Sequence, residues 1–173
     1  MTRPNEEIKQ KFERIRRALG LKPAIGRGTA TARARLVDGL LFEVEDGSWK
    51  MSVDLSERSG GTGSAPDPGV YGRTALASCL GINYSLHAAA RGLRISSLEI
   101  EVQADYDSNG NYGTIEQPPG YRQVRYLVDI EADATEEEIR RFVEDVDRHC
   151  PYLDNFSRAL DVQRELRITA SVG

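Results

Sequence analysis

The chain has 173 residues, 39% of them hydrophobic, which is enough for one domain with a real core. No apolar run approaches the roughly 20 residues that span a bilayer, and 29% of the residues are charged. The sequence therefore excludes a membrane-spanning helix. The 23 basic and 27 acidic residues give a net charge of −4, which lacks the positive excess typical of nucleic-acid-binding proteins. We therefore expect a cytoplasmic protein without nucleic-acid or membrane partners.

The first 22 residues predict a helical arm appended to a single domain over residues 23–173. They are charged throughout and contain no apolar segment of the kind that a secretory signal needs. Residues 5–19 have a helical period, Asn5 can cap the start, and Gly20 can end the helix. The apolar face comprises Ile8, Phe12, Ile15 and Leu19.

A β-meander is predicted next. Residues 29–37 alternate with a period of two, which indicates a strand with Arg33 and Arg35 on one face. The dipeptides Asp38-Gly39 and Asp46-Gly47 are typical of hairpin turns. They lead into strands predicted over residues 40–44 and 49–55.

A loop rich in Gly, Ser and Pro, residues 59–69, precedes a long helix. Asp67 is the expected N-cap, the helix runs from residue 68 to about residue 91, and Gly92 ends it. Residues 75–82 leave no polar face, which predicts a central helix or one sealed by a second subunit. The loop contains Gly60-Gly61-Thr62-Gly63 but lacks the lysine of a phosphate-binding loop, so we interpret it as a flexible loop near the mouth of a site.

The remaining elements complete an α+β pattern. Alternating residues predict strands over 98–104 and 124–130, separated by a polar loop over 107–120. Thr135 and Glu138 form a capping box for a helix that stops near residue 149, a short helix follows over 151–158, and a closing strand is predicted over 162–172. Because helices fall in only two places, we expect antiparallel sheets around two central helices rather than a doubly wound fold.

The chain has two cysteines and two histidines, which neither form a CxxC motif nor complete a zinc site with suitable spacing, so no metal and no cofactor are expected. Cys79 lies within the buried helix. Cys150 opens the short helix, where partial positive charge favours a thiolate. Alternatively, both are inert packing residues, because free cysteine is among the most buried residue types. His87 is about 12 Å along the helix from Cys79, too far to act as its base; His149 is interpreted as a helix-end residue.

Two segments resemble the OsmC/Ohr family, the osmotically inducible protein C-like and organic hydroperoxide resistance proteins. They are residues 68–79 (PGVYGRTALASC) and 149–152 (HCPY), supported by the order of elements over residues 28–172. The resemblance implies an intertwined homodimer with its active sites at the subunit interface. It also implies a hydroperoxide reductase of oxidative-stress defence. Cys79 would attack an organic hydroperoxide and become a sulfenic acid, Cys150 would condense with it to a disulfide, and a dithiol reductant, lipoylated or thioredoxin-like, would restore the pair.

The same resemblance implies an arginine beside the first cysteine. Arg33 and Arg35 are the candidates, Arg73 is a second choice, and simple surface solvation is the alternative for the two strand arginines. Peroxidase members carry a glutamate ten positions before the first cysteine, where this chain has Gly69. Because this glutamate is missing, the alternative is that the chain is a divergent, non-catalytic OsmC-like protein, which binds a small apolar or electrophilic ligand at the dimer interface.

Overall fold

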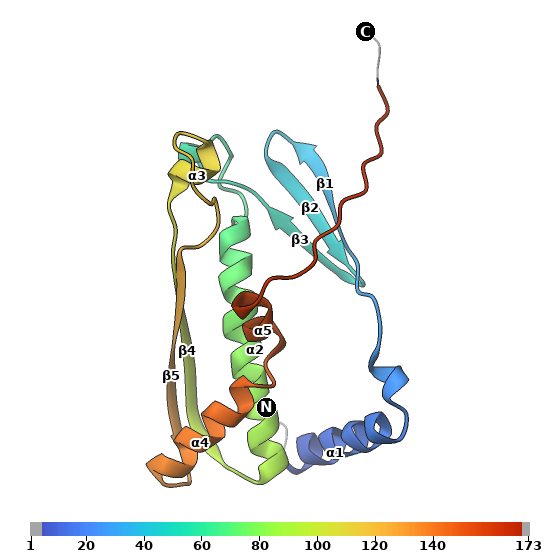
Figure 1. The fold of residues 1–173 in the computed structure, drawn as a ribbon, viewed down its shortest axis with the longest axis vertical. Coiled ribbons are helices and arrows are strands. Elements are labelled where there is room, and N and C mark those ends of the chain that lie inside the picture. The colour runs from blue at the N-terminus through green and yellow to red at the C-terminus, as the bar shows by residue number, and fades with distance from the viewer. Residues whose placement is uncertain (1–4, 171–173) are drawn as a thin grey trace.

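The computed structural model describes residues 5–170 and contains two antiparallel sheets (Figure 1). The first sheet has the order β1-β2-β3 and the second pairs β4 with β5. Gly39 and Gly47 turn the two hairpins of the first sheet with φ angles of 53° and 57°, as their positions predict. The strands are β1 (Ala32–Asp38), β2 (Leu41–Asp46), β3 (Trp49–Val53), β4 (Ile95–Asp105) and β5 (Gln123–Ala132).

Two of the helices begin where the sequence places their caps. The Asp67 side chain accepts a hydrogen bond from the Val70 N–H, and Thr135 and Glu138 form the predicted capping box. Gly92, in the left-handed conformation, ends the long helix. A five-residue helix inside the polar loop was not predicted. The helices are α1 (Asn5–Leu21), α2 (Pro68–Arg91), α3 (Ser108–Tyr112), α4 (Glu136–Asp147) and α5 (Pro151–Ser157), with 3-10 turns at Pro23–Gly26 and Glu57–Ser59.

The core lies between α2, the β4–β5 sheet and α4 (Figure 1). The apolar residues that alternate along β4 and β5 face α2, which confirms the predicted period of two. Cys150 is part of this core, and Cys79 packs against it. The fully enclosed apolar members are Leu76, Leu80, Tyr84, Ala88, Phe142 and Val146. This arrangement agrees with the predicted α+β class.

The first sheet stands to one side of this core (Figure 1). Every residue of β1 is exposed, and Trp49 at the start of β3 is 75% exposed. A hydrogen bond of 2.7 Å from the Tyr71 hydroxyl to the Ser52 carbonyl joins β3 to the start of α2. The sheet therefore carries apolar side chains that this chain alone leaves uncovered.

The loop between β3 and α2 is held by a buried aspartate, Asp54, which is 1% exposed. Its carboxylate accepts hydrogen bonds from the N–H and hydroxyl groups of Thr62 and Ser64 and from the Leu55 N–H, at 2.6–3.1 Å. The Thr62 hydroxyl, followed by the backbone donors, holds the pKa of Asp54 well below its usual range. These contacts hold the Gly-rich loop in a defined conformation.

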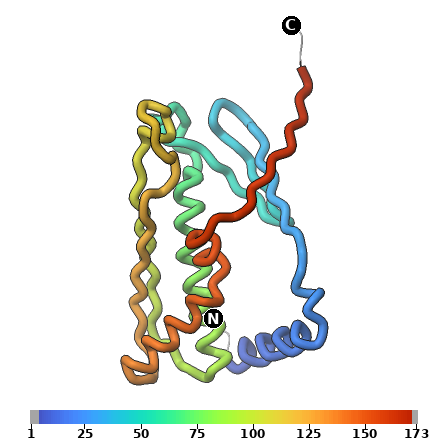
Figure 2. Tube along the Cα trace, in the orientation of Figure 1, coloured from blue at the N-terminus to red at the C-terminus, as the bar shows by residue number. Residues whose placement is uncertain are grey.

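The predicted closing strand is absent from the residues that the structure describes. Residues 159–170 follow α5 without pairing and extend beyond the helical body (Figure 2), and residues 171 and 172 of the prediction lie outside the described range. Val162 and Ile168 are 88% and 78% exposed. The alternation predicted a strand, but a strand forms only when another strand accepts its hydrogen bonds.

The N-terminal helix packs against the second half of α2. The Phe12 ring meets the His87 ring edge-on, with their centroids 5.2 Å apart. The helix continues through Gly20 to Leu21, one residue beyond the predicted stop. Among residues 5–170, no helix has the length and apolar character needed to cross a bilayer.

Candidate active site

Cys79 lies in the middle of α2 on the side that faces the core. It is half-buried, and Leu80, which follows it, is fully buried. The Asp67 cap and Pro68 set where the helix begins, and the apolar run then sets which face turns inward. Cys79 is thus held on a regular helix and is not fully enclosed.

Cys150 lies at the junction of α4 and α5 and is 2% exposed. It occupies the N-cap position of α5, at the start of the short helix that the sequence predicts. Burial raises the pKa of the Cys150 thiol; the backbone N–H groups of Leu153 and Tyr152 oppose this without outweighing it. The expected preference for thiolate at this helix start is therefore overturned: Cys150 is held as a neutral thiol.

The two cysteines, 71 positions apart in sequence, meet in space. The Cys150 thiol donates a hydrogen bond to the Cys79 sulfur, with the two sulfur atoms 3.6 Å apart. Both are free thiols. A disulfide needs about 2.05 Å between sulfurs, so the pair is reduced and lies within a small side-chain movement of bonding.

Asn83, one helical turn after Cys79, also contacts this sulfur. Its side-chain Nδ2 lies 2.9 Å from the Cys79 carbonyl oxygen and 3.5 Å from the Cys79 Sγ. Sequence reasoning missed this residue, although its spacing of four positions from Cys79 on a predicted helix was a usable signal.

A polar network around Asp147 lies next to Cys150. The Asp147 carboxylate accepts hydrogen bonds from the hydroxyl groups of Tyr84 at 2.5 Å and Tyr126 at 2.8 Å. Burial raises the pKa of Tyr84, and it raises the pKa of Tyr126 to about 12. The Asp147 carbonyl also accepts from the Cys150 N–H at 3.2 Å. These bonds tie α2 and β5 to the turn that carries Cys150, and nothing in the sequence alone pointed to them.

The predicted arginines lie on the first sheet. Arg35 is 3.7 Å from Glu43, and Arg33 stands opposite Glu45 in the strand register. Within residues 5–170, no hydrogen bond or ion pair of this single chain joins either arginine to Cys79. Both have an acidic neighbour on their own sheet.

The second-choice arginine, Arg73, lies near the position of the missing glutamate. Its Nη1 donates to the Tyr121 hydroxyl at 3.4 Å, and that hydroxyl donates to the Gly69 carbonyl at 3.2 Å. A Cβ placed at Gly69 would lie 3.1 Å from the same Nη1. A side chain at position 69 would therefore crowd this guanidinium.

The histidines form a separate group beside α1. The rings of His87 and His149 lie with their centroids 5.3 Å apart, and His149 Nδ1 is 2.8 Å from the Asp145 carbonyl oxygen. Burial, followed by His149 and Arg91, lowers the pKa of His87. The interpretation of His149 as a helix-end residue is confirmed by its contact with the last turn of α4.

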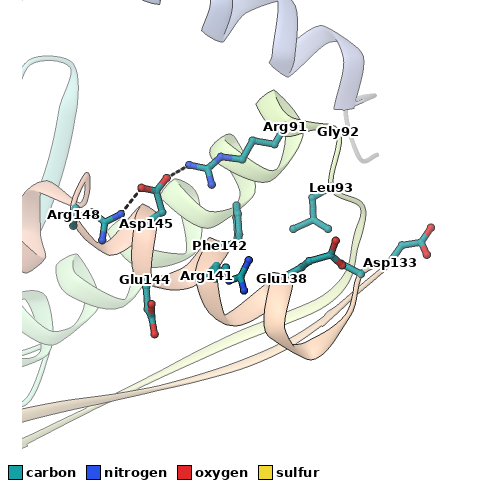
Figure 3. Close-up of a pocket in the computed structure, with 11 residues that line it drawn as sticks. Arg91, Gly92, Leu93, Asp133, Glu138, Arg141, Phe142, Glu144, Asp145 and Arg148 are labelled. Carbon is teal, nitrogen blue, oxygen red and sulfur yellow. Dashed lines mark hydrogen bonds and ion pairs between the residues drawn. The ribbon is translucent and has the colours of Figure 1, made fainter.

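A cavity of about 780 Å³ lies between the end of α2 and α4 (Figure 3). Asp145 stands between Arg91 and Arg148 and pairs with both (Figure 3), and the Arg91 guanidinium lies 5.4 Å over the Phe142 ring. Neither cysteine lines this cavity. Two of its three arginines are thus paired with Asp145, and the third, Arg141, pairs with Glu137 on α4, so each of these arginines already has an acidic partner.

A smaller cavity of about 470 Å³ lies beside the elements that carry the cysteines. Leu76 and Leu153, which line it, are each three residues from a cysteine, and the stacked rings of Tyr121 and Phe156 form another wall. Within residues 5–170, no group of three or more His, Cys, Asp and Glu side chains is arranged to hold a metal ion.

The comparison with known proteins agrees with this arrangement. A family model described as OsmC-like protein matches residues 61–165, well over half of the chain and including both cysteines. The chain belongs to the OsmC-like protein family. This confirms the family that the two cysteine motifs indicated. No curated protein sequence matches the chain.

Solved structures share the fold of this family member. An OsmC-like protein from Mycoplasma pneumoniae has a TM-score of 0.63 and 19% identity, covering 75% of this chain and 87% of that one. An organic hydroperoxide resistance protein OsmC from Legionella pneumophila has a TM-score of 0.55 and 18% identity, covering 75% and 90%. The organic hydroperoxide resistance protein OhrB of Bacillus subtilis has a TM-score of 0.51 and 20% identity, covering 81% and 98%. At these identities the likeness concerns the fold.

Proposed function

We propose that this OsmC-like protein is a thiol-dependent organic hydroperoxide reductase, with Cys79 as the peroxidatic residue and Cys150 as the resolving residue. The observation that carries the proposal is the contact of two free sulfurs at 3.6 Å. Two of the three solved structures described above are named as organic hydroperoxide resistance proteins. A dithiol reaction needs such a pair, whereas two unrelated packing cysteines have no reason to meet.

The unequal burial of the two cysteines supports this order of roles. Cys79 is half-buried and within reach of a small molecule, whereas Cys150 is 2% exposed. Because burial raises the pKa of Cys150, it remains a thiol while Cys79 reacts. The residue that meets the substrate first is therefore Cys79.

The proposed cycle has three balanced steps. The Cys79 thiolate attacks the terminal oxygen of ROOH, forming an S–O bond and breaking the O–O bond, so that sulfur is oxidised by two electrons and RO⁻ takes a proton to leave as an alcohol. The Cys150 thiol then attacks the sulfenic sulfur, and water leaves as the disulfide forms. A dithiol reductant, lipoylated or thioredoxin-like, reduces the disulfide by exchange through a mixed disulfide. We place the cycle in the cytoplasm, where such reductants keep thiols reduced.

We also propose that the working form is an intertwined homodimer. The first sheet, the C-terminal segment and the outer side of α2 all expose large apolar side chains, among them Trp49, Ile82 and Ile168 at 75%, 65% and 78%. Apolar surface of this extent marks an interface. The alternation over residues 162–170 would suit pairing with a strand of a second copy. In such a dimer Arg33 and Arg35 remain the candidates for the cation beside Cys79.

The decisive experiment measures the consumption of cumene hydroperoxide with a dithiol reductant. We expect Cys79→Ser to abolish turnover, and Cys150→Ser to turn over more slowly than the parent protein, because the dithiol reductant must then resolve the sulfenic acid from outside the chain. Ser78→Ala is a matched control, since Ser78 is exposed and adjacent but bonds only to the helix, at the Ala75 carbonyl. Equal rates for the parent protein and Cys79→Ser would overturn the proposal.

A binding protein is the second candidate, and Gly69 is the observation that favours it. The glutamate position of peroxidase members has no side chain here, while a cavity of about 470 Å³ with a partly apolar lining lies beside the cysteine-bearing elements. On this reading the cavity, enlarged by a second copy, holds a small apolar or electrophilic molecule without turnover. Saturable binding of cumyl alcohol, together with no peroxide consumption by the parent protein, would favour it.

A further inference from the structure

We propose that Asn83 is a catalytic residue of this site: its side-chain amide donates a hydrogen bond to the Cys79 sulfur and thereby supports the reactive thiolate. The inference rests on the proposed function and adds a group that is neither a cysteine nor a charged residue. It follows from the position of one amide nitrogen, which lies 3.5 Å from the Cys79 Sγ.

The orientation of the Asn83 amide is determined by a second contact. The same nitrogen lies 2.9 Å from the Cys79 carbonyl oxygen, which can only accept a hydrogen bond. If the amide were turned over, two oxygens would face each other at this distance. The NH₂ group must therefore face Cys79, and because it carries two protons, one can serve the carbonyl and the other the sulfur.

The surroundings of Cys79 explain why an uncharged hydrogen-bond donor would support its thiolate. Its sulfur accepts from Asn83 on one side and from the Cys150 thiol on the other. Within residues 5–170, the hydrogen bonds and ion pairs of this single chain bring no arginine or lysine to that sulfur. A hydrogen bond donated to the charged form favours that form, so both donors stabilise a thiolate at Cys79 before the peroxide arrives.

The helix explains why asparagine suits this position. Residues four apart lie on the same face of an α-helix, so a short side chain at position 83 reaches back one turn to Cys79. Asparagine in the middle of a helix lowers helix stability relative to alanine. Its presence here is therefore not explained by helix formation.

The test follows the pH dependence of iodoacetamide alkylation in a Cys150→Ser background, where Cys79 is the single reactive thiol. Asn83→Ala should slow alkylation at pH 7 by about three- to tenfold and move the whole profile to higher pH, as expected for the loss of one hydrogen bond of ordinary net strength. Asn83→Asp keeps the size of the side chain but adds a negative charge, and should move the profile further in the same direction.

Ser85→Ala is the matched control, since the Ser85 hydroxyl bonds at 2.9 Å to the Gly81 carbonyl of the same helix. It should leave the profile unchanged. A profile for Asn83→Ala that superimposes on that of the Cys150→Ser parent would overturn the inference, because a purely structural contact would not alter the titration of the sulfur. Alkylation consumes no peroxide, so a shifted profile in a protein that fails to reduce hydroperoxide would overturn only the proposed function.

Discussion

Oxidation of the cysteine pair should stabilise the protein by an amount that the structure sets. The sulfurs of Cys79 and Cys150 are 3.6 Å apart, so the approach needed for a bond is small. The bond would close a loop of 71 positions. For a loop of this length, the loss of chain entropy in the unfolded state is worth about 4 kcal/mol at 25 °C, and strain in the folded state would reduce that value.

The assay combines thiol counting with urea unfolding. Diamide should reduce the number of titratable thiols from two to none per chain and raise the free energy of unfolding by about 2–4 kcal/mol. Cys150→Ser, treated in the same way, is the control that removes the cross-link. Two thiols persisting after oxidation of the folded protein, or a disulfide formed only between chains, would refute the reasoning that the pair is ready to bond.

Three further predictions concern the loop and the core. A Cβ at Gly61 would overlap the Leu55 carbonyl oxygen and come within 2.6 Å of Asp54 Oδ1. Gly61→Ala should therefore lower the free energy of unfolding by about 1–3 kcal/mol. An unchanged urea midpoint would show that the loop can move aside. The lowered pKa of Asp54 means that its contribution to stability is present above about pH 4 and is lost as the pH falls toward the folded-state pKa. Asp54→Asn should therefore unfold with a shallower pH dependence below pH 4, and parallel acid titrations would contradict this. Burial raises the pKa of Cys150 above its ordinary 9.0 and that of Tyr126 from 10.0 to about 12. The folded state thus retains protons that the unfolded chain loses, and stability should fall as the pH rises above 9; a urea midpoint that stays constant from pH 8 to 11 would count against it.

Much of the fold was predictable because its determinants are local. The Asp67 cap and Gly92 bound α2 as expected, and Thr135 with Glu138 starts α4. Each is set by φ/ψ preferences and hydrogen bonds within a few residues, which any chain with these side chains would show. Asn83 belongs to this class too, since its reach to Cys79 follows from helical spacing alone.

What the sequence by itself determined was thus the succession of helices and strands, their caps and turns, and the two cysteine motifs that indicated the family. Only the tertiary structure decided that the sulfurs of Cys79 and Cys150 touch, that Asp147 binds two tyrosines, and that Asp54 holds the Gly-rich loop. It also decided that residues 162–170 remain unpaired despite their strand-like alternation. The physical reason is that each of these features depends on contacts between segments that are distant in the chain. The periodicity of a segment predicts its secondary structure, but it does not specify which other segment will pack against it.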